Sequence, residues 1–378
     1  MKMTISTMEM FKEDIKDKEV VIFGAGEYCM RFLNRIDEED FERISFLVDN
    51  NAERQGTSLF GIMIKSPEEL RNIEPENTVV VIAVSNGIPT VYQQICDMGQ
   101  YNIVSARILM NAVFSQVAKV LVENQDEIKK VTELLYDDKS KMIYNEIIKR
   151  RMLYGECDFS DLIVRGDVEY CVPLIHGKAR PKDEVIIDCG AYKGDTLKKF
   201  VETYGPQLKR VYSFECVEES AKELSLAMRY IRNKKYCPEM ILMPYALSDH
   251  EGKLKLAIAN DLPAASFVIE NREFAKNHFY QSDCVEVDVT TLDKVISEDE
   301  KVTLIKMDIE GSEYSALHGA EGIIKRCKPK LAISIYHCGE DYYRIPLYLK
   351  SIVPEYKFAV RHHKKNHVDT DLYCWIEE

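Results

Sequence analysis

Two stretches of the sequence share one pattern, an apolar run that leads into a glycine-bearing turn and then into a helical segment. They are VVIFGAGEYCMRFL at residues 20–33 and VIIDCGAYKGDT at residues 185–196. An unbroken apolar run is typical of a strand covered on both faces, as in a parallel sheet with helical crossovers. Glycines in such a turn let backbone N–H groups approach a ligand near the positive end of a helix. The chain is therefore expected to contain two α/β domains, each with a turn suited to a ligand.

The remaining sequence supports this division. Strand-like and helix-like segments alternate over residues 19–110, and the alternation resumes from about Asp167. Between them, apolar and charged residues recur at helical spacing, which indicates two connecting helices. The predicted domains are a Rossmann-like domain at 1–110, a helical linker at 111–165 and a larger domain at 166–378.

The larger domain contains a regular series of strand-like segments. Five apolar runs alternate with helices, and YKFAVRH and DLYCWIE close the chain as a hairpin. Between the third and fourth runs, KLKLAIAN and DCVEVDV are expected to form an antiparallel insertion at the sheet's edge. The predicted fold class is α/β, with a class I methyltransferase Rossmann-like sheet preceded by a smaller Rossmann-like domain and a helical linker.

Composition limits the partners and the cellular setting. The 378 residues carry a net charge of −13, with 46% hydrophobic and 30% charged residues, the balance of a globular protein. An acidic chain repels phosphate backbones, so no nucleic-acid partner is expected. No apolar run approaches the roughly 18 residues of a membrane span, and no signal peptide is visible. The 11 cysteines are scattered without a C-x-x-C pair, which favours reduced thiols and a cytoplasmic location. The oligomeric state is not predicted.

The acids around the second turn favour a cationic cofactor over a pyrophosphate. Asp188 ends the strand, Asp195 follows the second glycine, and Glu215 ends the next apolar run. An acid at the end of that next strand accepts hydrogen bonds from ribose hydroxyls. S-adenosyl-L-methionine carries a sulfonium, an amino group and a ribose, so it fits this set of acids.

The same region resembles the FkbM family of S-adenosylmethionine-dependent methyltransferases. The pieces DCGAYKGDT, SFECVEES, PYALSDHEG, VTTLDKVI, LIKMDIEGSEYSALHGA and ISIYHC occur in the family's order over about residues 180–378. The family usually has proline after the acid of the second strand, where this chain has Cys216. The resemblance implies O-methylation of a hydroxyl on a sugar, a nucleotide-sugar or a related small metabolite.

The resemblance also implies which residues bind the cofactor. Three residues after the third strand hold the adenine, and an acid after the fourth faces the methionine end. Carried over position by position, the cofactor residues are Asp188, Gly190, Ala191, Gly194, Asp195, Thr196, Glu215, Ala246, Leu247, Ser248 and Asp308.

Three side chains are candidates for removing the acceptor's proton. Glu310 and Glu313 follow the fourth strand, and His337 ends the fifth. Adjacent strand ends meet at one edge of such a sheet, so these groups can converge within hydrogen-bond reach of a substrate. The alternatives are a helix-capping role for Glu313 and a structural role for His337. Asp308 with Glu310 and His337 could also bind a hard cation, but no second ligand cluster is visible and no metal is predicted.

Three more histidines lie in RHHKKNH, residues 361–367. This basic segment is expected to be a solvated loop of the terminal hairpin and not a metal site.

The first turn carries a partial dinucleotide fingerprint. Gly24 and Gly26 occupy its first two glycine positions, Cys29 replaces the third, and Asp49 stands where a ribose-binding acid is expected. GAGEY, VDNNAERQG, IKSPEEL and VVIAVSN resemble the Rossmann-like N-terminal domain of sugar acyltransferases, which implies that Gly24, Gly26 and Asp49 bind a nucleotide-sugar. The alternative is a structural or interaction domain that binds no ligand.

Together these features predict an S-adenosyl-L-methionine-dependent O-methyltransferase that acts on a sugar, nucleotide-sugar or related small acceptor. One alternative is a non-catalytic nucleotide-binding scaffold or sensor, against which the acids at 188, 195, 215 and 308 count. The other is an NAD-dependent nucleotide-sugar enzyme that uses the N-terminal turn. No catalytic constellation for hydride transfer supports it.

Overall fold

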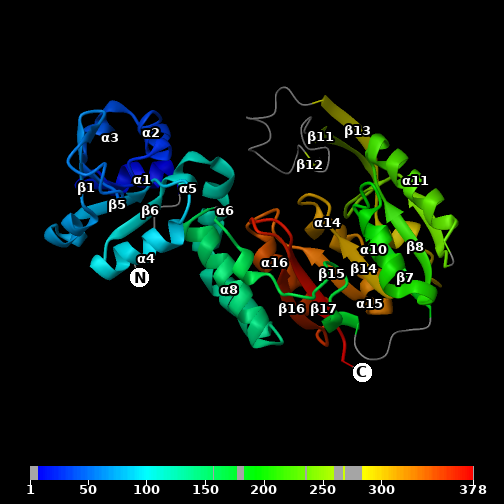
Figure 1. Cartoon of the computed structure of the whole chain (residues 1–378). Helices are drawn as coiled ribbons and strands as arrows, with labels where there is room; N and C mark the ends of the chain where they lie inside the picture. Colours follow the sequence, from blue (N-terminus) through cyan, green and yellow to red (C-terminus); the bar gives the residue numbers. More distant parts are fainter. Residues whose placement is uncertain are drawn as a thin grey trace. The chain divides into compact units, whose positions relative to one another are not determined.

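The structure is a computed structural model that describes residues 7–155, 157–176, 183–234, 236–258, 267–268 and 283–377. The chain divides into two compact units (Figure 1). The first contains Met1–Ile128, Asn145–Asp161 and Lys365–His367, and the second contains Lys129–Tyr144, Leu162–Lys364 and Val368–Glu378. In the part of the chain described, no helix combines the length and the apolar character that a membrane crossing requires.

The first unit is built on a six-stranded sheet in the order β3-β4-β2-β1-β5-β6. All neighbouring strands are parallel except the short β3–β4 hairpin. The strands are β1 (Glu19–Phe23), β2 (Ile44–Val48), β3 (Ser58–Leu59), β4 (Ile62–Lys65), β5 (Thr78–Ile82) and β6 (Asn102–Ser105). The parallel sheet was expected from the apolar runs, and the β3–β4 hairpin is an addition.

Helices cover both faces of this sheet, because its central strands are apolar on both sides. Val20, Ile22 and Val79 share one core with α1, α2 and α5, while α4 lies on the side opposite α2 (Figure 1). The sixth strand ends at Ser105, whose hydroxyl accepts the Arg107 N–H and caps α5. The helices are α1 (Met8–Asp14), α2 (Glu27–Leu33), α3 (Glu38–Glu42), α4 (Ile88–Met98) and α5 (Ala106–Met110), with 3₁₀ turns at Pro67–Asn72 and Pro75–Asn77.

The segment predicted as two linker helices contains three. They are α6 (Ala112–Glu123), α7 (Gln125–Leu134) and α8 (Asp138–Leu153). Asn124 separates the first two, because its backbone (φ −117°, ψ 35°) leaves the helical region.

The second unit contains a seven-stranded sheet in the order β16-β17-β15-β14-β7-β8-β9. The five strands from β9 to β15 are parallel, and β17 is antiparallel to both β15 and β16. The strands are β7 (Glu184–Cys189), β8 (Leu208–Phe214), β9 (Glu239–Met243), β14 (Leu304–Met307), β15 (Lys330–Ser334), β16 (Lys357–His362) and β17 (Thr370–Trp375). This order confirms the predicted class I methyltransferase-type sheet with its terminal hairpin.

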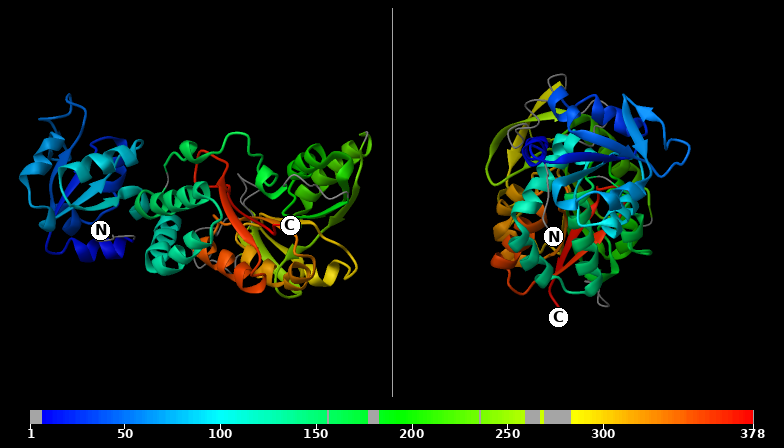
Figure 2. Two further views of the ribbon diagram at one scale, coloured as in Figure 1. Left: turned by 90° about the horizontal axis from the view of Figure 1, so that it is seen from below. Right: turned by 90° about the vertical axis from the view of Figure 1, so that its left-hand side faces the viewer.

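Helices pack on both faces of the larger sheet (Figures 1 and 2). Leu197 and Phe200 of α10 and Leu224 of α11 join one core with β7, β8 and β14. The helices that follow the later strands, from α14 to α16, contribute no residue to that core. The helices are α9 (Pro173–His176), α10 (Asp195–Tyr204), α11 (Glu218–Arg232), α13 (Leu292–Val295), α14 (Glu313–His318), α15 (Glu321–Cys327) and α16 (Asp341–Ile352), with 3₁₀ turns at Ser160–Leu162 and Gly205–Gln207.

The predicted insertion forms a sheet of its own and does not extend the edge of the main sheet. Its order is β10-β13-β11-β12, with β11 antiparallel to β13 as expected. The strands are β10 (Ala246–Leu247), β11 (Gly252–Ile258), β12 (Phe267–Val268) and β13 (Asp283–Thr290).

The expectation of a solvated loop at 361–367 is wrong for its first two histidines. His362 ends β16 and is fully buried, with Nδ1 2.9 Å from the Thr370 hydroxyl of β17. The imidazole of His363 is 6% exposed, and burial lowers its pKa to about 4. Pairing of β16 with β17 therefore extends to these two histidines. The basic composition of the segment did not predict this.

Candidate functional site

A cavity of about 340 Å³ lies at the carboxyl ends of β7, β8 and β14. This is the point where the strand order reverses, and open α/β sheets bind ligands there. Its size falls within the range of small-molecule sites. It is lined by Glu169, Tyr170, Gly190, Tyr192, Asp195, Thr196, Phe214, Glu215, Cys216, Val217, Ser220, Tyr245, Ala246, Leu247, Leu254, Leu256, Lys306, Asp308, Ile309, Glu310, Ser312, Tyr336, Lys364 and Asp369.

Backbone strain is concentrated around this cavity. Six non-glycine residues of the described chain have positive φ, and four of them line the cavity: Tyr170, Tyr192, Glu310 and Asp369. Such conformations cost energy and cluster at ligand sites, where the surrounding structure enforces them. The concentration of strained residues at this cavity is what a ligand site would show.

The turn after β7 requires glycine at its first position. Gly190 has φ +79°, and a Cβ placed on it would lie 2.0 Å from the Asp308 carbonyl oxygen. The N–H groups of Gly190 and Ala191 both donate to the Phe214 carbonyl, at 3.1 and 2.9 Å. The turn thus brings the ends of β7, β8 and β14 into contact.

Glu215 shapes the same turn from β8. Its carboxylate accepts the N–H groups of Tyr192 (2.9 Å) and Val217 (2.8 Å) while it lines the cavity. Burial raises its pKa, partly offset by these hydrogen bonds. Each oxygen keeps a free lone pair, so the carboxylate can still accept ribose hydroxyls as predicted.

Asp188 lies behind the cavity and does not line it. The side chain is fully buried, with Oδ1 3.2 Å from Lys306 Nζ. Burial lowers the pKa of Lys306, but Asp188 and Asp308 outweigh it and raise the pKa above its ordinary value. Lys306 is therefore a permanent buried cation that faces the cavity, and no motif in the sequence analysis identified it.

Asp308 is the acid that the fourth strand presents to the cavity. It accepts hydrogen bonds from the hydroxyls of Tyr170 (2.9 Å) and Tyr336 (3.4 Å). Burial raises its pKa, but Lys306 and His337 outweigh this and lower the pKa below the usual range. The carboxylate is ionised at neutral pH, and the two tyrosine hydroxyls hold it in place.

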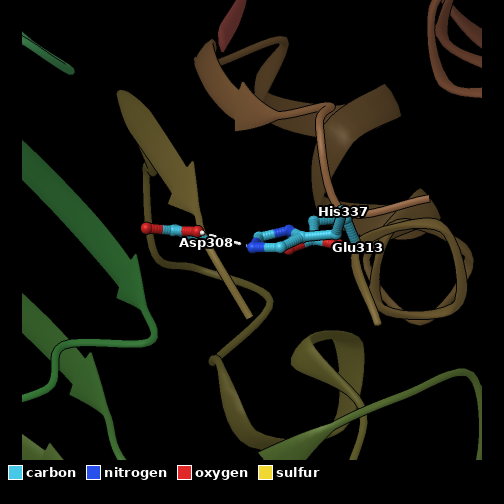
Figure 3. Close-up of side chains that lie close together, drawn as sticks. All are labelled: Asp308, Glu313 and His337. Atoms are coloured by element: carbon cyan, nitrogen blue, oxygen red, sulfur yellow. Dashed lines mark ion pairs between the residues drawn. The ribbon is translucent and has the colours of Figure 1, made fainter. Parts of the chain in front are cut away.

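Three carboxylates surround the imidazole of His337, which is 5% exposed. Figure 3 shows two of them, those of Asp308 and Glu313. Nδ1 lies 3.0 Å from Glu313 Oε1, and Nε2 lies 3.4 Å from Glu310 Oε2 and 3.5 Å from Asp308 Oδ1. Burial lowers the pKa of His337, but Glu313 and Glu310 outweigh it and raise the pKa to about 10. The residues predicted to converge from the fourth and fifth strands are thus brought together.

Glu313 and Glu310 differ in what they touch. Glu313 is fully buried and accepts the N–H groups of Ile309 (2.8 Å) and Gly311 (3.0 Å), which folds the loop after β14 around it. Glu310 belongs to the same loop, has φ +57° and lines the cavity. Glu313 therefore positions the loop, and Glu310 presents its carboxylate to a ligand.

Eight of the residues predicted for the methyltransferase site line the cavity: Gly190, Asp195, Thr196, Glu215, Ala246, Leu247, Asp308 and Glu310. Six lie around it without lining it: Asp188, Ala191, Gly194, Ser248, Glu313 and His337. Eight further lining residues were not predicted: the tyrosines at 170, 192, 245 and 336, the lysines at 306 and 364, and the acids at 169 and 369. Lys306 could have been found, since a lysine inside the apolar strand LIKMD is unusual.

In the N-terminal turn, the acid is engaged by groups of the protein itself. Asp49 accepts the N–H groups of Ala25 (2.7 Å) and Asn51 (2.8 Å) and pairs with Arg54 at 3.0 Å. Gly24 has φ +107°, and a Cβ on it would lie 2.7 Å from the Ala83 carbonyl oxygen. Asp49 therefore stabilises the turn itself. Binding of a nucleotide-sugar by Gly24, Gly26 and Asp49 stays a prediction.

Comparisons with known proteins give a consistent picture. Residues 188–360 match the family model described as the methyltransferase FkbM domain, and residues 16–108 match one described as C2185-like, N-terminal. Among solved structures, methyltransferase FkbM from Methylobacillus flagellatus KT is similar, with a TM-score of 0.57 and 22% identity over 95% of this chain and 90% of that one. An rRNA methylase from Streptococcus thermophilus is matched with a TM-score of 0.31 and 12% identity over 52% of this chain and 90% of that one. The first likeness shows a shared fold, and the second is too weak to support an argument. No curated protein matches the chain significantly.

Proposed function

Since the chain belongs, through residues 188–360, to the FkbM methyltransferases, we propose that it transfers a methyl group from S-adenosylmethionine to a hydroxyl of a sugar, nucleotide-sugar or related small metabolite. The observation that carries the proposal is the cavity that unites Gly190, Glu215 and Asp308 at the switch point of the sheet. Beyond the family match, this cavity has a size and a charge that suit S-adenosylmethionine.

The residues present fit this cofactor. Gly190 leaves backbone exposed where a side chain would block the turn. Glu215 lines the cavity with an oxygen that could accept ribose hydroxyls, and Ala246 and Leu247 offer an apolar wall beside Leu254 and Leu256 for an adenine. Acids outnumber lysines along the lining, which suits a ligand with a sulfonium and an amino group.

S-adenosylmethionine supplies an already activated methyl group, so the protein has to bind, align and deprotonate the acceptor. The hydroxyl proton passes to a carboxylate, the oxygen bonds to the methyl carbon, and the carbon–sulfur bond breaks with its electrons on sulfur. Among the three residues predicted for deprotonation, Glu310 lines the cavity, and its side chain is 30% exposed. Glu313 is fully buried and the imidazole of His337 is 5% exposed, so we assign both to positioning.

The first test is calorimetric titration of S-adenosylmethionine into the wild type and into Glu215→Ala. We expect micromolar binding to the wild type. Loss of hydrogen bonds to a charged acceptor costs about 1.5–3 kcal/mol, so the variant should bind roughly 10- to 100-fold more weakly. The exposed Glu202 gives the control Glu202→Ala, which should bind like the wild type. A folded wild type that does not bind the cofactor would reject the proposal and favour the scaffold alternative.

The second test addresses the acceptor. Purified protein with the cofactor is offered neutral sugars, nucleotide-sugars and small hydroxylated metabolites, and S-adenosylhomocysteine release is measured. Release that depends on one acceptor class identifies the substrate. An occupied cofactor site with no release for any acceptor class would contradict O-methylation of such compounds.

A further inference from the structure

The cluster around His337 carries more negative charge than its side chains neutralise. The carboxylates of Asp308, Glu310 and Glu313 all lie 3.0–3.5 Å from the ring nitrogens of His337. Lys306 also faces Asp308, but it is shared with Asp188. Buried uncompensated carboxylates are costly unless a cation pairs with them.

The ring nitrogens of His337 give a second, independent observation. Within the described residues, neither Nδ1 nor Nε2 has a hydrogen bond of acceptable geometry, although both are buried. The contacts with the carboxylates are close but misaligned. A buried polar atom left without a hydrogen bond needs an explanation, and coordination of a metal ion is one.

The spacing of the ligand atoms suits such an ion. One atom each of Asp308, Glu313 and His337 lies within 4.8 Å of the others. His337 Nε2 is 3.5 Å from Asp308 Oδ1 (Figure 3). Two ligands at 2.0–2.2 Å from a tetrahedral ion are about 3.4 Å apart. The observed distance is therefore too long for a good hydrogen bond and right for two ligands of one metal.

We propose that Asp308, Glu313 and His337 bind one divalent cation of the zinc or manganese class. No metal was predicted from the sequence, because no second ligand cluster is visible there. The fold brings the fully buried Glu313 of α14 to Asp308 and His337. One imidazole with two carboxylates suits Zn²⁺ or Mn²⁺ better than Mg²⁺, which prefers oxygen ligands. Asp308 lines the cavity, so a coordination position faces the ligand side, as in catalytic metal sites.

The role of the ion rests on the proposed function. A cation at Asp308 would bind the acceptor hydroxyl and lower its pKa, and the proton would pass to Glu310. The acceptor oxygen then bonds to the methyl carbon as the carbon–sulfur bond breaks. Two neighbouring hydroxyls chelate a metal better than one, so the substrate class is a vicinal diol, as sugars offer.

The site is tested first without cofactor or acceptor. Chelator-treated full-length protein is titrated with Mn²⁺, followed by electron paramagnetic resonance, and with Zn²⁺, followed by calorimetry. We expect one ion per chain, with affinity at least about tenfold lower in Asp308→Asn and His337→Gln. The surface histidine at 250, whose side chain is 59% exposed, gives the control His250→Gln, which should bind like the wild type.

A wild type that binds neither ion would overturn the inference, whether or not any variant folds. Binding that is equal in the wild type and in folded Asp308→Asn would also overturn it. Titration of S-adenosylmethionine into the chelator-treated wild type separates the two proposals. Cofactor binding without metal binding removes the metal site alone. Metal binding without cofactor binding removes the proposed function and leaves the metal site.

Discussion

Lys306 of β14 and Asp188 of β7 stand opposite each other in the parallel ladder and form an ion pair inside the sheet. Their side chains are 2% and 0% exposed. The ammonium also donates to the carbonyls of Cys189 (3.1 Å) and Gly190 (2.6 Å). The pair thus fastens the glycine turn to the strand that carries Asp308. Asp188 therefore acts on the cavity through Lys306, since it does not line the cavity itself.

Asp188→Asn should therefore act on stability. Removing one partner of a buried pair leaves an uncompensated charge, so the free energy of unfolding should fall by about 3–5 kcal/mol in urea. Lys253→Met breaks an ion pair whose side chains are 62% and 53% exposed, and should show no measurable loss. If Asp188→Asn kept full stability and lost only cofactor affinity, Asp188 would instead be a direct cofactor ligand.

Gly190→Ala tests the close approach of the turn to β14. The new methyl would lie 2.0 Å from a backbone carbonyl oxygen that cannot move cheaply. Gly166 has a similar φ of +89° with no atom within 4 Å of the place a methyl would take, so Gly166→Ala carries only the backbone strain of about 1–2 kcal/mol. We expect Gly190→Ala to lose more stability than this control and to lose S-adenosylmethionine binding. Equal thermal shifts in the two variants would argue against the close approach.

The sequence allowed prediction of what depends on local signals. Apolar runs and glycine positions identified β7, its turn and α10, and the acids at the strand ends followed from the parallel topology. Glu215, Asp308 and Glu310 were found in this way and line the cavity. The position of an acid in the chain does not tell whether its carboxylate faces a ligand or the interior, so Asp188 and Glu313 were assigned to the site surface.

What the sequence could not supply depends on long-range pairing. Tyr170 enters the cavity from the segment before β7, and Asp369 comes from the connection between β16 and β17. β17 inserts between β15 and β16, which brings that connection to the site. The hydrophobic periodicity of the sequence does not predict the order of the strands in the sheet. The lysine at 306 is visible inside an apolar strand, but its ion-pair partner is not, because its neighbour in the ladder is 118 residues away in the chain, as the numbers 306 and 188 show.

Asp369 should make stability depend on pH. Burial and the charge of Glu169 raise its pKa, and Lys364 offsets them only in part. The folded protein then binds a proton at this site above about pH 4, the ordinary value, where the unfolded chain has released it. This contribution to the free energy of unfolding is full below about pH 4 and is lost as pH rises through the folded-state pKa.

Asp369→Asn should remove that dependence. Asparagine tolerates the left-handed backbone at this position, where φ is +59°. Urea unfolding at several pH values between 4 and 7 compares the variant with wild type and with the exposed control Asp299→Asn. We expect a flatter pH profile only for Asp369→Asn. Parallel profiles for all three proteins would show that Asp369 titrates normally.

Glu310→Gln should separate chemistry from cofactor binding. The amide keeps the size of the side chain on the loop but cannot take a proton, and a positioned general base contributes roughly 10²- to 10⁴-fold to a rate. We expect kcat for S-adenosylhomocysteine formation to fall by about 100-fold while calorimetry gives an unchanged cofactor affinity. Glu202→Gln, an exposed change of the same kind, should keep full activity. A normal kcat in Glu310→Gln would show that another group accepts the proton. A loss of both kcat and cofactor affinity would show that Glu310 binds the cofactor.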